Sequence, residues 1–401
     1  MSNKRIIVIG GGAAGFFAAI NIAELLPDAS VCILEKTTKV LSKVKVSGGG
    51  RCNVTHACFE PKELSTNYPR GERELLGPFH QFATGDTIAW FSERGVELKM
   101  EEDGRMFPVT DSSQTIIDCF EKEVEKKGIE VKLSTEVAKI EKSSNFKLSL
   151  KNGGELQADA VVVAIGGNSK IKHYDFLKDL RLQLIDPIPS LFTFNLPKHA
   201  SNQLMGLSYE VSVRLKGTSF EEFGPLLFTH WGMSGPAILK LSAKAAKWLY
   251  DKSYQFEFEL SWLDDAEKFI SVNRQYSPST KVQKKKPEQM PQRLWNYLLS
   301  RAGLDQSVNW ADLNKRQMES LVKVLEADIY QANGKTTFKE EFVTCGGVDL
   351  KEINMKTMES KAIKDLYFCG EVMNVDAVTG GFNFQAAWTS GFLVAESIAN
   401  I

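Results

Sequence analysis

The chain has 401 residues, 43% of them hydrophobic, and carries 49 Lys and Arg against 50 Asp and Glu. This length predicts two or three domains with enough apolar material for stable cores. The near-zero net charge provides no overall field for a polyanion or an anionic bilayer, so neither nucleic acid nor a membrane is expected as a partner.

The six cysteines are scattered and form no CxxC pair, which predicts neither a disulfide framework nor a metal site. Glycines interrupt the first apolar run after four residues, so no signal peptide is expected, and no apolar run reaches membrane-spanning length. A cytoplasmic protein is therefore predicted, of unspecified oligomeric state. The basic cluster Lys281, Lys284, Lys285 and Lys286 beside Pro287 is interpreted as a solvated loop rather than a patch for a phosphate-bearing partner.

The first elements form a βαβ unit. A β-branched run at 5–10, a glycine cluster, the apolar helical stretch FFAAINIAELL and a buried-type strand at 31–34 follow one another. This order predicts a parallel sheet. A helix at 112–127 and strands at 129–133, 137–140 and 159–165 are interpreted as additions to the same sheet.

The pattern of apolar and polar residues changes at Pro187. Alternation in 209–215 predicts antiparallel strands, and the polar stretch 266–332, with an amphipathic segment at 313–327, predicts helices. From Gly346 the glycine-rich texture returns, with a strand at 366–369 and a helix at 384–399. We therefore expect an α/β fold, a discontinuous Rossmann-like domain made of 1–186 and 335–401, interrupted by a β-rich domain at 187–260 and a small helical domain at 261–334.

The segment GGGAAG at 10–15 satisfies GxGxxG between a predicted strand and a predicted helix. Gly10 allows the tight turn, Gly12 lets a pyrophosphate approach, and Gly15 lets the helix pack closely on the strand. Glu35 ends the second strand, where a carboxylate accepts hydrogen bonds from ribose hydroxyls and disfavours a 2′-phosphate. The expected ligand is FAD or NAD rather than NADP.

Two further glycine-rich segments favour FAD. In SGGGRCN at 47–53, backbone can approach a flat ring and Arg51 can reach a pyrophosphate or a ring carbonyl. Near the C-terminus, Gly370, Glu371 and Asp376 precede GGFN at 380–383, which runs into the last helix. The N-terminus of that helix is placed to stabilise negative charge on a reduced flavin.

The segments GGGAAG, SGGGRCNVTH, FTHWGMSGPAIL, TCGGVDLKEINMKTMESK and LYFCGEVMNVDAVTGGFNFQAAW together resemble the FAD-binding NAD(P)/FAD-dependent oxidoreductase family that includes aminoacetone oxidase and bile-acid reductase members. The resemblance implies an FAD domain with inserted β-barrel-like and helical domains. The cofactor-binding residues that it implies, together with those above, are Gly10, Gly12, Ala13, Ala14, Gly15, Glu35, Lys36, Lys43, Ser47, Gly48, Gly49, Arg51, Cys52, Asn53, Val137, Ala164, Gly166, Gly167, Gly370, Glu371, Asp376, Gly381, Phe382, Asn383 and Gln385. Val137 is implied as a backbone contact to adenine. Asn374 and Phe382 depart from the family, whose members often have Asp and Tyr there.

Several alternatives compete at these residues. Cys52 and Cys58 invite comparison with flavin disulfide reductases, but their spacing is one residue longer and no second GxGxxG is present, so Cys52 is interpreted as a buried apolar residue. His230 is a weak catalytic candidate, because a lone histidine is more often structural. Ser234 lacks the G-x-S-x-G context of a nucleophile.

The predicted function is FAD-dependent hydride exchange between flavin N5 and a small organic substrate, at an amine, a hydroxyl or an activated alkene. NAD(P)H is retained as an electron donor that needs no dedicated motif. The alternatives are a redox-sensing or binding flavoprotein without turnover and an NAD-only dehydrogenase.

Overall fold

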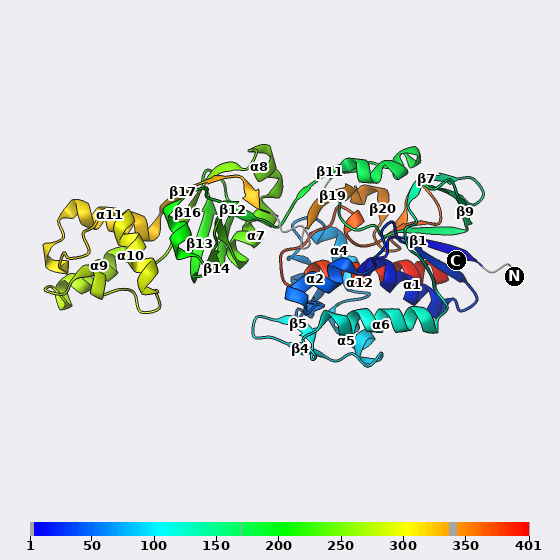
Figure 1. The fold of residues 1–401 in the computed structure, drawn as a ribbon, viewed down its shortest axis with the longest axis horizontal. Helices are drawn as coiled ribbons and strands as arrows, with labels where there is room; N and C mark the ends of the chain where they lie inside the picture. Colours follow the sequence, from blue (N-terminus) through cyan, green and yellow to red (C-terminus); the bar gives the residue numbers. More distant parts are fainter. Residues whose placement is uncertain (1–3, 169, 337–342, 401) are drawn as a thin grey trace. The chain divides into compact units, whose positions relative to one another are not determined.

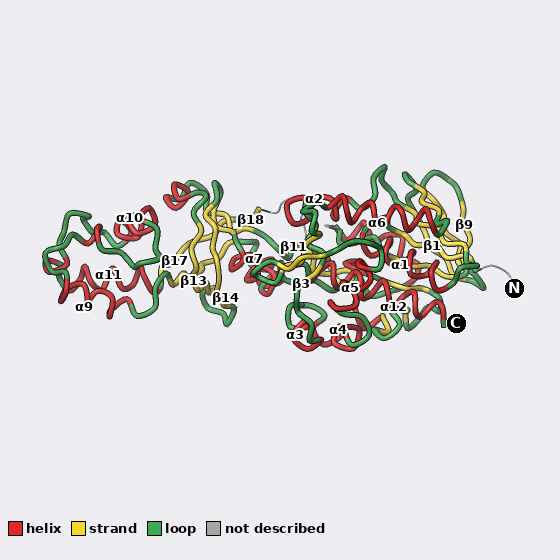
Figure 2. Tube along the Cα trace, turned by 90° about the horizontal axis from the view of Figure 1, so that it is seen from below, coloured by secondary structure: helices red, strands yellow, loops and turns green. Residues whose placement is uncertain are grey.

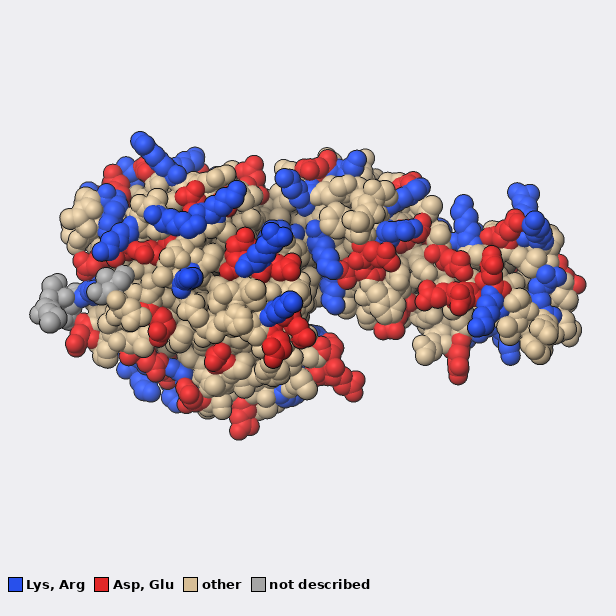
Figure 3. Space-filling view, turned by 180° about the vertical axis from the view of Figure 1, so that it is seen from behind, with Lys and Arg blue, Asp and Glu red and all other residues tan. Residues whose placement is uncertain are grey.

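The computed structural model describes residues 4–168, 170–336 and 343–400. The chain divides into two compact units, one made of residues 1–190 with 338–401 and the other of residues 191–337. Acidic and basic side chains are interspersed over the face drawn in Figure 3, in keeping with the near-zero net charge.

A seven-stranded sheet organises the first unit. Its order is β20 (Ile353–Asn354), β21 (Glu359–Ser360), β22 (Leu366–Phe368), β10 (Ala160–Val163), β1 (Arg5–Ile9), β2 (Ser30–Leu34) and β6 (Glu130–Lys132). The five strands from β22 to β6 are parallel, and β20 and β21 extend the sheet antiparallel. β10 and β22 are buried along their whole length, as expected for strands covered on both faces.

The helices of the first unit are α1 (Ala13–Leu25), α2 (Ser42–Gly50), α3 (Pro61–Ser65), α4 (Glu72–Phe79), α5 (Thr84–Ser92), α6 (Ser113–Lys126) and α12 (Phe382–Ala399). Of these, α1 and α12 pack against the sheet, and the further helices pack on these two or on each other. Figure 1 and Figure 2 both show α1 and α12 side by side, although they lie more than 350 residues apart in the chain. The N-terminal and C-terminal segments therefore build one Rossmann-like domain, as predicted.

One predicted addition to the sheet is wrong. β7 (Val137–Lys142) does not join the parallel sheet but pairs with β8 (Phe146–Leu150), which pairs with β9 (Glu155–Ala158) in a separate antiparallel sheet. Only Val137 and Ile140 of the six residues in β7 are buried, so this strand is not covered on both faces as β10 is. The turn residues Asn152, Gly153 and Gly154 connect β8 to β9.

Two smaller sheets complete the first unit. β3 (Thr55–His56), β5 (Arg105–Pro108) and β4 (Leu98–Met100) form one of them. β11 (Leu184–Pro189) and β19 (Thr344–Val348) form an antiparallel pair. β11 precedes the second unit in the chain and β19 follows it, so the two strands that flank the second unit are hydrogen-bonded to each other.

The second unit contains one antiparallel sheet. Its order is β17 (Asp328–Asn333), β16 (Gln255–Ser261), β13 (Ser208–Leu215), β14 (Glu221–Phe228), β15 (Gly232–Ser234), β12 (Thr193–Asn195) and β18 (Lys335–Thr336). Only Gly334 separates the end strands β17 and β18 in the chain. The sheet is therefore rolled until its two edges meet, which is the predicted barrel-like arrangement.

The helices of the second unit are α7 (Pro236–Lys244), α8 (Ala246–Asp251), α9 (Ala266–Tyr276), α10 (Gln292–Arg301) and α11 (Lys315–Glu326). Side chains of α9, α10 and α11 belong to the same buried cluster as those of the sheet. Arg301 on α10 also pairs with the buried Asp328 of β17. β17 lies within the range predicted as helical, because the alternation in DIYQAN is short and follows directly on the amphipathic segment of α11.

Candidate functional site

The turn between β1 and α1 is shaped by glycine. Gly10 has φ of +119°, and a Cβ atom there would lie 2.3 Å from the carbonyl oxygen of Ala164. A Cβ atom on Gly15 would lie 2.0 Å from the carbonyl oxygen of Gly10, so Gly15 permits the close packing of α1 on β1. Gly12 is the N-cap of α1, and no side-chain hydrogen bond caps the helix there. A Cβ atom built on Gly12 would have no protein atom within 4 Å. The free N–H groups of α1 therefore point into a space that an anion can occupy.

Glu35, at the end of β2, holds the loops on either side of it. Its Oε2 accepts a hydrogen bond from the N–H of Gly11 at 2.9 Å, and its Oε1 accepts one from the N–H of Thr37 at 2.8 Å. The carboxylate is thus fixed beside the glycine turn. Each oxygen retains a lone pair for a further donor.

A cavity of about 450 Å³ opens beside this turn. Its lining includes the predicted site residues Gly10, Glu35, Lys36 and Val137, and the side chain of Phe176 from the 3₁₀ segment η1 (Ile171–Leu180). Ile165 also lines it, directly after Ala164. Residues from at least five separate segments of the sequence therefore share one concave site within the first unit.

The segment 47–53 departs from regular helix within α2. Ser47 is extended, and Gly48 and Gly49 have φ of +57° and +69°. Nothing lies within 4 Å of a Cβ built on Gly49, so this backbone is exposed to a neighbouring ligand. Arg51 points elsewhere: its guanidinium pairs with Glu101 at 2.5 Å and stacks 3.9 Å from the centroid of the Phe107 ring.

Asn53 is 8% exposed, and its Oδ1 atom is buried without a hydrogen-bond partner in the described structure. Gly381, the N-cap of α12, lies against it, since a Cβ there would be 2.8 Å from that oxygen. α12 also begins without a side-chain cap. An unsatisfied buried acceptor costs about 1–3 kcal/mol unless a ligand or water supplies a donor.

Other predicted residues near α12 serve the protein itself. Gln385 is fully buried, accepts hydrogen bonds from Thr55 and Thr87, and donates to Thr389. Asn383 exchanges two hydrogen bonds with the backbone of Ala377. Both side chains fix the approach to α12 rather than leave an amide free for a ligand.

Phe382, the first residue of α12, contacts His56 and Tyr68, two aromatic residues that the sequence did not indicate. Its ring stacks on His56 with centroids 4.5 Å apart, and its carbonyl oxygen accepts a hydrogen bond from Tyr68 at 2.6 Å. His56 Nδ1 lies 3.0 Å from the carbonyl oxygen of Gly380. His56 is the last residue of SGGGRCNVTH, a segment that resembles the family, and this position was the one feature of the sequence that could have pointed to it.

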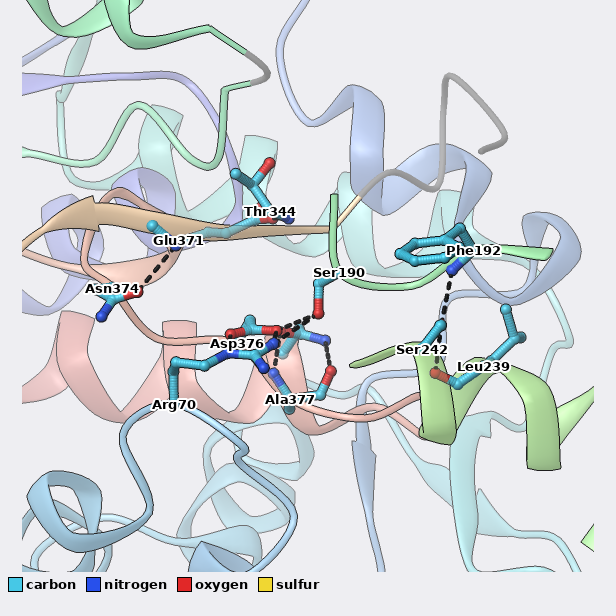
Figure 4. Close-up of polar contacts among 12 residues, drawn as sticks. Arg70, Ser190, Phe192, Leu239, Ser242, Thr344, Glu371, Asn374, Asp376 and Ala377 are labelled. Atoms are coloured by element: carbon cyan, nitrogen blue, oxygen red, sulfur yellow. Dashed lines mark hydrogen bonds and ion pairs between the residues drawn. The ribbon is translucent and has the colours of Figure 1, made fainter. Parts of the chain in front are cut away.

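A buried ion pair holds Asp376. Arg70 contacts both carboxylate oxygens, and Ser190 donates a hydrogen bond to one of them (Figure 4). Asp376 is fully buried, so these two partners replace the water that a carboxylate would otherwise bind. Arg70 in YPRGE carries no recognisable spacing, and no sequence signal pointed to it.

Glu371 contacts residues from several segments that the sequence assigned to the cofactor site. Its carboxylate pairs with Lys43 at 2.7 Å and accepts a hydrogen bond from the N–H of Thr344 at 2.8 Å, and a Cβ on Gly167 would lie 2.5 Å from it. A Cβ on Gly370 would lie 2.7 Å from that of Ala14. Lys43, Gly167, Glu371, Gly370 and the α1 turn are therefore neighbours.

His230 lies in the second unit, in the turn between β14 and β15, beside Trp231. It is not among the residues that line the described cavity. Within the described ranges, no group of three His, Cys, Asp or Glu residues has the arrangement of a metal site.

These observations fit a bound dinucleotide. Two long helices with glycine N-caps leave their N–H groups uncapped, Gly12 and Gly49 face open space, and Asn53 presents an orphan acceptor. The neighbouring cavity brings a carboxylate and an apolar wall together at the end of the parallel strands, where such folds bind nucleotides.

Comparison with known proteins gives the family. Residues 4–397 match the family described as HI0933-like protein Rossmann domain. The chain belongs to this family. The predicted membership of an FAD-binding oxidoreductase family and the predicted fold class are thereby confirmed.

Two curated relatives are similar over nearly the whole chain. A ribosomal RNA dihydrouridine synthase of Haemophilus influenzae is 31% identical over 407 residues, which cover 98% of each protein. A 3-dehydro-bile acid delta(4,6)-reductase of Clostridium scindens is 26% identical, and the match covers 99% of each. Among solved structures, the 3-ketosteroid-delta4-(5alpha)-dehydrogenase of Rhodococcus jostii has the same fold, with a TM-score of 0.55 at 13% identity over 99% of this chain and 97% of that one.

No helix in the described part of the chain combines the length and the apolar character needed to cross a membrane.

Proposed function

We propose that this chain is an FAD-dependent reductase that adds two hydrogen atoms across a carbon–carbon double bond conjugated to a carbonyl group. The observation that carries the proposal is full-length similarity to two enzymes whose named reactions share this chemistry. Dihydrouridine arises when the uracil double bond beside a carbonyl is saturated. A delta(4,6)-reductase acting on a 3-dehydro bile acid saturates double bonds conjugated to a ketone.

The first unit contains the residues that we assign to FAD binding. We assign the pyrophosphate to the uncapped turn at Gly12 and the N-terminus of α1, the adenosine ribose to Glu35, and the adenine to the cavity wall at Val137 and Phe176. When bound, FAD supplies a ring that carries a hydride to or from the substrate.

The flavin end is assigned to the segment around Asn53 and the N-terminus of α12. The uncapped N–H groups there would stabilise negative charge on the ring, and the Asn53 Oδ1 would be available to accept a hydrogen bond from a ring N–H. The stacked pair of His56 and Phe382 gives this end a rigid apolar wall.

Between the two substrate classes, a uridine within RNA is favoured over a free enone. The dihydrouridine synthase is 31% identical to this chain and the bile-acid reductase 26%. This proposal replaces the expectation of a small-molecule substrate with a nucleotide base held in a polymer.

The test is anaerobic turnover of purified protein loaded with FAD. The flavin is reduced with NADPH or NADH, and is then offered either a uridine-containing transcript or a 3-oxo-4,6-diene bile acid. The expected result is reoxidation of the flavin together with a gain of two hydrogen atoms per product, measured by mass spectrometry. A transcript without uridine is the matched control.

If neither alkene reoxidises the reduced flavin, and an amine or an alcohol bleaches the oxidised flavin, the proposal is overturned in favour of an oxidase. Failure of every electron donor and every substrate favours a redox-sensing or binding flavoprotein.

A further inference from the structure

Charge is unevenly distributed along this nearly neutral chain. The segment from Ala266 to Glu326, which contains α9, α10 and α11, has eleven Lys and Arg against six Asp and Glu. The rest of the chain has 38 against 44. A positive helical segment is therefore attached to an otherwise negative protein, a pattern that overall net charge conceals.

Most of these cations are not neutralised by neighbouring carboxylates. In the described structure, ion pairs involve only Arg301, with Asp328, and Lys315, with Glu319, among the eleven. Lys281, Lys284 and Lys285 are exposed and form no ion pair there. An acidic group does lie near this cluster: the pKa of Asp305 is lowered, mainly by hydrogen bonds from Ser307 and also by the charge of Lys281.

The lysine-bearing loop has a fixed backbone. Val282, at the start of the 3₁₀ turn η3 (Val282–Lys284), is fully buried, and its carbonyl oxygen accepts a hydrogen bond from Trp295 Nε1 at 3.0 Å. Its N–H donates to the carbonyl oxygen of Val308 at 2.9 Å.

Hydrogen bonds to two other glutamines fix Gln283, the residue after Val282. The Gln283 carbonyl oxygen accepts a hydrogen bond from Gln292 at 3.0 Å, and the Gln283 side chain donates to Gln306 at 2.8 Å. A merely solvated lysine run needs no such anchoring. The structure instead presents three lysines from a rigid support, which lowers the entropic cost of binding a partner with regularly spaced negative charges.

We propose that this surface, formed by Lys281, Lys284 and Lys285 on the helical segment, docks the phosphate backbone of RNA. The proposal rests on the proposed function, because a uridine substrate within RNA brings phosphates with it. Backbone contacts of this kind position a nucleic acid without reading its sequence. The negative remainder of the chain disfavours RNA elsewhere and so directs the polymer to this segment. On this proposal, the interpretation of the lysine cluster as a solvated loop is replaced.

The test measures binding of a fluorescein-labelled, uridine-containing RNA hairpin by fluorescence anisotropy, using FAD-loaded protein. The triple variant Lys281→Glu, Lys284→Glu, Lys285→Glu is compared with a control of equal charge change, Lys62→Glu, Lys122→Glu, Lys364→Glu, whose lysines are exposed on the first unit. Neither set touches a residue assigned to FAD, and unchanged flavin absorption and thermal unfolding establish that both variants are folded.

The expected result is at least a tenfold loss of RNA affinity in the first variant at about 0.1 M salt. The negative slope of the logarithm of the association constant against the logarithm of salt concentration is expected to become less steep by about 2. The control is expected to lose less than threefold. Equal losses in both variants, or none in either, overturn the proposal, as does a surface that binds anionic phospholipid vesicles but not the hairpin. Failure of the proposed function is distinct, since alkene reduction then fails in the wild type while the lysine-dependent binding persists.

Discussion

Gly10 and Ala164 lie so close together that the backbone carbonyl of one excludes any side chain on the other. A Cβ atom on Gly10 would be 2.3 Å from the Ala164 oxygen, and φ at Gly10 is +119°. Two residues along the chain, Gly12 faces open space within 4 Å. The same motif thus contains one glycine required by the fold and one that only a ligand can require.

The variant Gly12→Ala is expected to fold and to lose FAD. The new methyl group meets no protein atom, and the N-cap position limits the loss of stability to about 1 kcal/mol. The methyl group occupies the space through which a pyrophosphate approaches the helix, so FAD affinity is expected to fall at least tenfold. Thermal unfolding of the FAD-free protein and FAD fluorescence titration measure the two quantities separately.

Gly10→Ala is the matched comparison, and it is expected to reduce stability by several kcal/mol through the backbone clash. Wild-type FAD affinity in Gly12→Ala contradicts the assignment of the pyrophosphate to this turn.

Replacement of Glu35 by Gln is expected to reduce both the stability of the folded protein and its affinity for FAD. The carboxylate accepts from the N–H groups of Gly11 and Thr37, whereas the amide of Gln places a donor against one of them. A cost of about 1–3 kcal/mol follows from the unsatisfied donors. Urea unfolding of the FAD-free protein measures this cost.

Glu136→Gln is the control for this variant, because Glu136 lines the same cavity and its ion pair among the described residues is with the exposed Lys151 at 2.6 Å. Its removal is expected to change stability by less than about 1 kcal/mol. If the two variants lose FAD affinity equally, Glu35 has no special role in binding the ribose.

Arg70 and Asp376 are expected to be strongly coupled. Removing either partner leaves a buried charge, so Arg70→Met and Asp376→Asn are each expected to reduce the free energy of unfolding by about 3–5 kcal/mol. The double variant is expected to lose less than the sum of the two. Urea unfolding of all four proteins gives the coupling energy, and simple additivity contradicts a direct interaction.

The sequence predicted the Rossmann-like part well, because its signals are local. Continuous apolar runs such as 159–165 and the glycine turn at 10–15 report strand burial and close backbone approach directly. β7 was assigned to the wrong sheet, since a short strand does not reveal its partner. Only two of its six residues are buried, whereas every residue of β10 is.

The site was predicted less completely, for a physical reason. Glycine motifs identify where a ligand approaches backbone, but contacts between distant side chains have no local pattern. Arg70 meets Asp376 across 306 residues, and Phe382 stacks on His56 across a similar separation. Gln385 illustrates the converse, because its place in a motif suggested a ligand contact while its amide is hydrogen-bonded within the protein.

Cys52 is expected to be unreactive. Its side chain is fully buried, and burial raises the pKa of the thiol to about 12, so the thiolate that would attack an alkylating agent or a disulfide is scarce at neutral pH. Cys58 is only partly buried, although its pKa is also raised, mainly by burial. Iodoacetamide at pH 8 is therefore expected to modify Cys58 well before Cys52, as peptide mass spectrometry of the quenched reaction can measure. Unfolding in urea is expected to abolish the difference.

Cys52→Ala is expected to retain reduction of the flavin by NADPH or NADH. Loss of that reduction in a folded variant with FAD bound, or formation of a Cys52–Cys58 disulfide during turnover, would instead favour a disulfide reductase.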